Sequence, residues 1–274
     1  MMSKKNRHLD DLRSILSGSS ISNVRETLYK YIVENSNLPG PRANLELATS
    51  FEEIISHRIS MESAKALWDF CSAMAALSAE NAPSNDPSEF IAFCGTRGLG
   101  AIGAAIPDFR MKALLRMRSL ATDSRWRMRE AVAMALWRLL ATGEVGIREE
   151  IEEWIEQGDW LIMRGAVAGI SEPSLLTDGN YAQWALQVHR KAIDIILASS
   201  DRKSDEFKTL RKALGYTLSV VVQAVPTSGF NLLESLLGKE DSDIDWIVKQ
   251  NLKKKRLTTN FPTEVGLLKK QISQ

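Results

Sequence analysis

Four stretches of the 274-residue chain share a recurring text: DSRWRMREAVAMAL (123–136), GDWLIMRGAVAGI (158–170), DEFKTLRKALGYTL (205–218) and DIDWIVKQNLKKKRL (243–257). Each stretch sets a basic residue at the start of an apolar run with helical spacing. These basic anchors are Arg129, Arg164, Arg211 and Lys249, at intervals of 35, 47 and 38 residues. Because one helical pair cannot bury its apolar stripe alone, the recurrence predicts an array of stacked pairs.

The rest of the chain has the same helical character, since apolar residues recur at helical spacing and strand-like alternation is scarce. Short clusters of Pro, Gly, Asn and Ser separate the apolar stripes, and none is a long linker. We therefore expect an uninterrupted array. The predicted parts are an N-terminal helical cap or arm at 1–40, the repeat array at 41–257 and a C-terminal tail at 258–274.

The composition bounds the class of protein. Hydrophobic residues make up 44% and charged residues 25% of the chain, as in ordinary folded proteins. The formal net charge of +1 argues against a polyelectrolyte binder of nucleic acid or acidic membrane, so only local charge segregation supports such binding. No apolar stretch is long enough for a membrane span or a secretory leader, and we expect a cytoplasmic protein. Cys71 and Cys94 lie in apolar helical patterns and are predicted to be buried thiols.

An Asp precedes the basic anchor by six residues in three of the four stretches. The pairs are Asp123 with Arg129, Asp205 with Arg211, and Asp243 with Lys249. In the remaining stretch Asp159 is only five residues before Arg164, and Gly158 occupies the position where the Asp is expected. This text resembles the HEAT-repeat, armadillo-like family. The resemblance implies an all-α fold, a right-handed superhelical α-α solenoid of HEAT-like helical pairs, in which turn carboxylates accept hydrogen bonds from neighbouring basic anchors as a ladder.

No pattern of catalytic residues emerges from the sequence, and we expect no cofactor. His8, His57 and His189 are scattered and lack metal-ligand spacing, so no metal site is predicted. Nucleophile and phosphate-loop motifs are also missing. The glycine cluster lacks dinucleotide-binding order and indicates close helix packing instead. Its members are Gly95, Gly98, Gly100 and Gly103.

Local charge is strongly segregated. Basic residues dominate from Arg110 to Arg129, whereas the next expected helix carries five glutamates between Glu149 and Glu156. One interpretation is a pair of solvated faces on adjacent units, and the other is a basic groove for phosphate or an acidic partner. A further basic run, Lys253–Arg256, either extends such a groove or solvates the array's end. The candidate binding residues are Arg110, Lys112, Arg116, Arg118, Arg127, Trp160 and Arg164.

Three tryptophans precede their anchors by three or four residues: Trp126, Trp160 and Trp246. Their rings either close the seams between repeats or line the inner curve and stack on a partner. Since solenoids present extended grooves and no chemistry is visible, the leading hypothesis is a non-catalytic scaffold that binds a protein or peptide partner on its concave surface.

The alternative hypothesis is a nucleic-acid-binding protein or enzyme. The chain is similar in build to the HEAT-like DNA alkylation-repair glycosylases, which combine basic grooves, tryptophans and a carboxylate. Their catalytic residues do not carry over residue by residue, because the Asp and Arg candidates here are assigned to the repeat ladder. The resemblance therefore implies a related fold, and activity is not predicted from it.

Overall fold

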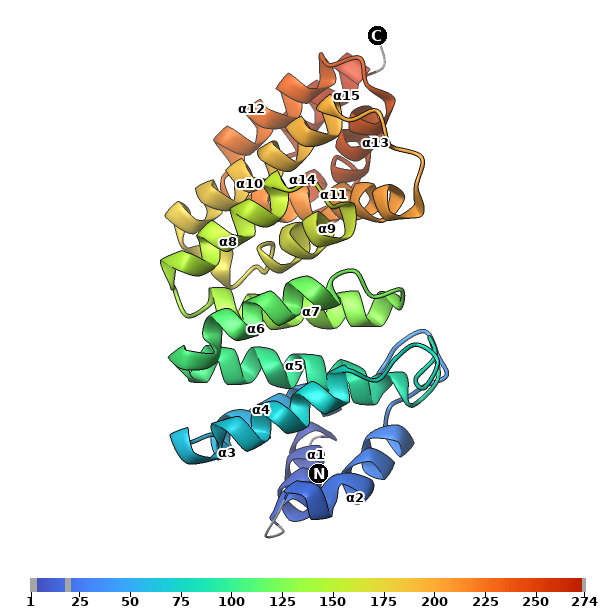
Figure 1. Ribbon diagram of the computed structural model, residues 1–274. Coiled ribbons are helices and arrows are strands. Elements are labelled where there is room, and N and C mark those ends of the chain that lie inside the picture. The colour runs from blue at the N-terminus through green and yellow to red at the C-terminus, as the bar shows by residue number, and fades with distance from the viewer. Residues whose placement is uncertain (1–3, 18–20, 273–274) are drawn as a thin grey trace. The chain divides into compact units, whose positions relative to one another are not determined.

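The computed structural model describes residues 4–17 and 21–272, and all regular structure within these residues is helical. The chain divides into two compact units, residues 1–143 and residues 144–274 (Figure 1). Many consecutive helices pack against each other in both units, such as α5 with α6 in the first and α11 with α12 in the second. The prediction of an all-α fold of stacked helical pairs is confirmed within each unit.

The first unit contains seven described helices, arranged in layers. They are α1 (Lys4–Leu16), α2 (Ile21–Glu34), α3 (Leu45–Arg58), α4 (Met61–Ala75), α5 (Glu89–Ala105), α6 (Pro107–Leu120) and α7 (Trp126–Leu140). α3, α5 and α7 pack side by side in one layer, while α4 and α6 pack on α5 (Figure 1). α1 packs on α3 and α2 on α5, so the segment expected to be an N-terminal helical cap or arm at 1–40 contributes two helices to this unit.

α5 forms the centre of the first unit and is buried from Glu89 to Gly103. Glycine allows its neighbours to approach closely. A Cβ on Gly95 would lie 2.6 Å from the backbone nitrogen of Ala75 in α4, and one on Gly100 would lie 2.6 Å from the Cβ of Ala135 in α7. The predicted role of the glycine cluster in close packing is confirmed. Both cysteines are free and buried, as predicted.

The second unit is also built from layers of packed helices. Its elements are α8 (Val145–Glu156), α9 (Trp160–Gly169), the 3-10 turn η1 (Leu175–Thr177), α10 (Gly179–Ala198), α11 (Asp205–Ala224), α12 (Pro226–Leu237), α13 (Ser242–Asn251), α14 (Lys255–Asn260) and α15 (Pro262–Ile272). α11 packs against α9 on one side and α13 on the other, while α10 contacts α8, α11 and α12.

The segment at 258–274, expected to be a polar tail, is largely helical instead. Pro262 opens α15, a position where its fixed φ and missing N–H suit a helix. Val265 and Leu268 are three residues apart on one face of α15 and are buried, and α15 packs on α12 and α14. A short apolar face is thus enough to anchor this helix on a preformed layer.

The ladder of Asp and basic anchors forms in one place and is replaced elsewhere. The guanidinium of Arg211 in α11 donates to the carboxylate of Asp243 in α13, so one repeated stretch contacts the next. This is the contact with a neighbouring anchor that the resemblance implies, whereas Lys249, the anchor of the same stretch, lies 3.9 Å from Asp245. A neighbouring helix offers the closer cation, because Asp243 and Lys249 are six residues apart and lie on different sides of α13.

The two other Asp residues of the predicted ladder have local partners. The carboxylate of Asp123 accepts hydrogen bonds from the side chain of Arg125 at 2.9 and 2.7 Å, while Arg129 donates to the backbone oxygen of Asp123 at 2.6 Å. Asp205 lies at the exposed start of α11, where Lys208, one turn along, is 2.8 Å away. Cations two and three residues away thus bind these two carboxylates.

His189 is a completely buried polar group between α10 and α11. Nδ1 lies 2.8 Å from the carbonyl oxygen of Ala185, which can only accept, so Nδ1 carries the proton. Nε2 therefore accepts from the hydroxyl of Thr217 at 3.0 Å. Burial lowers the pKa of His189 to about 4, and the imidazole is neutral at physiological pH.

Candidate functional site

Large apolar side chains are exposed at two places in the described part of the first unit. Met111 and Leu115 lie one turn apart on α6, with exposed fractions of 43% and 53%. Leu45 at the start of α3 and Trp126 at the start of α7 are each 47% exposed, and both line the same pocket. Two helices that are far apart in sequence thus bring their exposed apolar residues together, which makes this pocket the leading candidate site.

The pocket has a volume of about 720 Å³ and lies where α3, α5 and α7 meet the loop between α2 and α3. Its apolar wall consists of Leu45, Phe93, Trp126 and Met134. Its charged residues are Arg42, Glu46, Arg127 and Glu130. Because the lining has two cations and two carboxylates around an apolar wall, the pocket suits an apolar group with polar surroundings.

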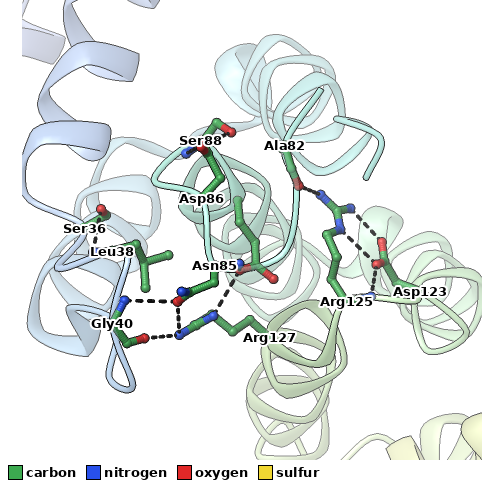
Figure 2. Close-up of polar contacts among 11 residues, drawn as sticks. Ser36, Leu38, Gly40, Ala82, Asn85, Asp86, Ser88, Asp123, Arg125 and Arg127 are labelled. Carbon is green, nitrogen blue, oxygen red and sulfur yellow. Dashed lines mark hydrogen bonds and ion pairs between the residues drawn. The ribbon is translucent and has the colours of Figure 1, made fainter. Parts of the chain in front are cut away.

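A buried arginine fixes the loop that forms one side of the pocket. Arg127 is 3% exposed, and its guanidinium donates to the carbonyl oxygen of Gly40 at 2.5 Å, to Oδ1 of Asn85 at 3.2 Å and to the carboxylate of Glu89 at 3.2 Å. Asn85 Oδ1 also accepts the backbone N–H of Gly40 at 3.0 Å, and Figure 2 shows these contacts converging. The loop is therefore held to α5 and α7 before any partner arrives.

The neighbouring turn is fixed in a similar way. Arg125 is 3% exposed and donates to the carbonyl oxygen of Ala82 at 3.0 Å as well as to Asp123 (Figure 2). Trp126 stands between Arg125 and Arg127, and the Arg127 guanidinium lies 4.4 Å from the centre of its ring. The indole thus rests on a buried cation while nearly half of its surface stays exposed, so it presents a rigid aromatic surface to the pocket.

A buried charge cluster follows the pocket along the same three helices. Arg97 is four residues after Phe93 on α5, Arg138 is four residues after Met134 on α7, and Glu52 lies on α3. The Glu52 carboxylate is fully buried, accepts from Arg97 and lies 3.2 Å from Nε of Arg138. Burial raises the pKa of Glu52, and the two guanidinium groups oppose this shift. Two cations therefore share one carboxylate.

The structure divides the predicted basic surface between Arg110 and Arg129 into separate local contacts. Arg110 donates to the carbonyl oxygens of Gly103 and Ala104 at the end of α5, at 3.3 and 3.4 Å. The ammonium of Lys112 lies 4.7 Å from the centre of the Trp68 ring. Arg116 lines another pocket, Arg118 is half-buried on α6, and only Arg127 of this basic group lines the candidate pocket.

The two candidate binding residues of the second unit lie against other helices. Trp160 packs edge-on against Phe207 of α11 with 5.5 Å between ring centres, and Arg164 is 6% exposed. Trp246 lies beneath the guanidinium of Arg211, 4.6 Å from the centre of the ring. Two of the three repeat tryptophans thus close seams between helices, while Trp126 lines a pocket.

Sequence reasoning missed Leu45, Phe93 and Met134 as site residues. Each looks like an ordinary member of an apolar helical stripe, and only the packing of α3, α5 and α7 brings them together. The one usable signal was the adjacent pair Trp126 and Arg127, which joins an aromatic ring to a cation beside a helix start.

Within residues 4–17 and 21–272, the structure holds no group of three or more His, Cys, Asp and Glu residues placed to bind a metal ion. In the same residues, none of the helices combines the length and the apolar character that crossing a membrane requires.

Neither a family model nor a curated protein matches this chain. Among solved structures, the chain is similar to the designed armadillo repeat protein YIII(Dq)4CqI, with 16% identity, 81% of this chain and 98% of that chain covered, and a TM-score of 0.27. Two engineered proteins have 14% and 12% identity and TM-scores of 0.33 and 0.35, with 94% of this chain covered in both cases and 98% and 100% of theirs. These scores are low, and the all-α assignment rests on the helices described above.

Proposed function

We propose that the chain is a non-catalytic binding module, and that the pocket between α3, α5 and α7 takes an apolar side chain of a protein or peptide segment. The observation that carries this proposal is the convergence of Leu45 and Trp126, both 47% exposed, on one pocket of about 720 Å³. Apolar burial supplies the driving force. Covering about 100 Å² of apolar surface contributes about 2.5 kcal/mol.

The fixed walls of the pocket support the same proposal. Arg127 ties the loop through Gly40 and Asn85, and it also supports the Trp126 ring from below. A wall that is already ordered loses little conformational entropy when a partner binds, so more of the contact energy appears as affinity. Rigid aromatic residues are the side chains that most often dominate the affinity of protein interfaces.

The experiment is a selection of random peptides on the full chain, followed by titration of the enriched peptides against three variants. Trp126→Ala and Leu45→Ala remove the two exposed walls of the pocket. Leu115→Ala is the matched control, because Leu115 is a similarly exposed Leu of the same unit, 53% against 47%, and lies outside the pocket.

We expect both pocket variants to weaken binding by about tenfold or more, because truncating a central aromatic or aliphatic contact costs more than about 1.4 kcal/mol. The Leu115→Ala variant should bind like the unmodified chain. Enriched peptides that bind all three variants equally well would contradict the proposal.

A second candidate function is nucleic-acid binding, and the exposure of Trp126 is the observation that favours it. A base stacks on an aromatic ring whatever its sequence, and a positive charge beside the ring adds to the attraction. A single-stranded oligonucleotide, titrated at several salt concentrations, tests this function. Steeply salt-dependent binding that is lost in Trp126→Ala would favour it over peptide binding.

A further inference from the structure

The charge of the cluster formed by Glu52, Arg97 and Arg138 is unbalanced. Each guanidinium carries a full positive charge at any physiological pH, and Glu52 supplies the single carboxylate that both of them contact. The cluster therefore holds a surplus positive charge. Arg97 is 5% exposed and the Arg138 side chain 23%, so much of this charge is shielded from water.

The hydrogen-bonding capacity of the cluster is also incomplete. Among the described residues, neither Nε of Arg97 nor Nε of Arg138 has a hydrogen-bond acceptor with good geometry. Both Nε atoms are buried, so an incoming anion does not bond to them, but an anion beside the open part of the cluster lowers the electrostatic cost of its shielded surplus charge. Of the two arginines, Arg138 is the one that a partner can reach, because part of its side chain is open to solvent.

The cluster continues the apolar wall of the candidate pocket. Arg138 lies one helical turn beyond Met134 on α7, about 6 Å along the helix axis. On α5, Arg97 lies one turn beyond Phe93, with its guanidinium 6.0 Å from the centre of that ring. Side chains two residues apart on an extended peptide point the same way and are about 6.6 Å apart. The distance of about 6 Å from Met134 to Arg138 along α7 is thus close to the distance between two such side chains of an extended peptide.

We infer that the partner of this pocket is an acidic peptide segment, in which a Glu or Asp two residues from the apolar anchor binds Arg138. The inference rests on the proposed function, since it takes the apolar anchor as given. At the rim of the pocket, Arg42 offsets one of the two carboxylates of Glu46 and Glu130, while the charge of Arg127 is already met by the buried Glu89. The surplus positive charge therefore lies at the cluster, and the acidic residue of the partner has to lie there rather than at the rim.

A carboxylate fits this site better than a nucleic-acid backbone. Binding along a phosphate chain needs a series of cations on one track. The described cations nearest Arg138 in sequence are engaged elsewhere. Arg129 donates to the backbone oxygens of Asp123 and Ser124, and Arg148 lies over the rings of Tyr181 and Trp184. One arginine with a partly open side chain, one helical turn beyond an apolar pocket, suits a single planar carboxylate, which Arg binds with two parallel hydrogen bonds.

The test uses short peptides with blocked ends and a background of Gly, Ser and Asn. They carry a Leu, Phe or Trp anchor and either Glu or Gln two residues before or after it. Fluorescence anisotropy measures their affinity for the full chain. We expect the best Glu peptide to bind about tenfold more tightly than its Gln counterpart, because a charge-assisted hydrogen bond contributes about 1.5 kcal/mol or more.

Variants assign that preference to one residue. In Arg138→Gln the preference for Glu should disappear, and in Arg138→Lys it should be partly retained, since the charge remains and the paired geometry is lost. Arg116→Gln is the matched control, because Arg116 is a half-buried Arg of the same unit that lies outside the pocket. Should Arg138→Gln fail to fold, the unmodified chain still provides a test, as the preference for Glu must shrink with added salt.

The outcomes separate the inference from the proposed function. Binding that is lost in Trp126→Ala but shows no preference for Glu overturns the inference and leaves the proposed function standing. Lack of any binding sensitive to Trp126→Ala overturns both. A single-stranded oligonucleotide that displaces the Glu peptides, and binds more tightly than they do in an Arg138-dependent way, identifies a nucleic acid as the occupant and overturns the acidic peptide.

Discussion

Replacing His189 with Gln removes a buried titratable group and should make the protein less sensitive to acid. The folded state holds the imidazole neutral, because Nδ1 donates to Ala185, Nε2 accepts from Thr217, and burial lowers the pKa from 6.5 to about 4. The unfolded chain has the ordinary pKa. Between these two values the unfolded state binds a proton that the folded state does not, so the free energy of unfolding falls as the pH falls.

The size of the effect follows from the difference between the two pKa values. A gap of about 2.5 pKa units corresponds to about 3 kcal/mol in total, of which about 2 kcal/mol is lost between pH 7.5 and pH 5. The assay is urea unfolding of the unmodified chain and of His189→Gln at several pH values. The other histidines, His8 and His57, are present in both proteins, so their contributions cancel in the comparison.

Two results would refute this reasoning. One is an equal loss of stability on acidification in both proteins, which would mean that His189 does not take up a proton on unfolding. The other is an NMR titration of the folded protein in which the His189 ring changes protonation near its ordinary pKa. Either result would place the ring in contact with water rather than between α10 and α11.

Three further predictions concern the stability of the fold, and chemical denaturation measures each of them. Gly95→Ala should destabilise by about 1 to 3 kcal/mol, because the new methyl meets backbone of α4, whereas Gly146→Ala, with open space around it, should be neutral or stabilising. Asp243→Ala should cost about 1 to 3 kcal/mol by leaving Arg211 without its carboxylate, and an unchanged midpoint would show that the pair is only solvated. Arg127→Met should cost about 3 to 5 kcal/mol, since it strands a buried carboxylate, and a small effect would mean that water reaches that group.

The recurring text predicted the helices well, because a helix can pack against its neighbours only if apolar residues recur along one of its faces. Each of the four stretches places an apolar stripe that α7, α9, α11 and α13 bury in the structure. The role of the glycine cluster could be predicted for a similar reason. Glycines such as Gly95 and Gly100 leave room on a helix for close neighbours, and α5 has such neighbours on both sides.

The partners of the charged residues were harder to predict. They depend on which side chains come within hydrogen-bonding distance in the folded chain, and not on the spacing of the repeat. Asp123 and Asp243 stand at equivalent places in the repeated text, yet one binds Arg125 two residues away and the other binds Arg211 on a different helix. The basic stretch around Arg110 fitted either a solvated helix face or a groove for phosphate or an acidic partner. Arg110 instead binds carbonyl oxygens at the end of a helix, an arrangement that a linear sequence does not distinguish from a free cation.

The three repeat tryptophans show why the site lies where the repeat is interrupted. Trp160 and Trp246 face a neighbouring helix of the second unit, and Phe207 or Arg211 covers their rings. Trp126 holds the equivalent place in its own stretch, but there the irregular loop between α2 and α3 faces it across a pocket. A regular repeat would place a packed helix against this ring and bury it. The loop held by Arg127 leaves the ring exposed, so a departure from the repeat turns a residue that elsewhere fills the space between helices into part of a candidate binding surface.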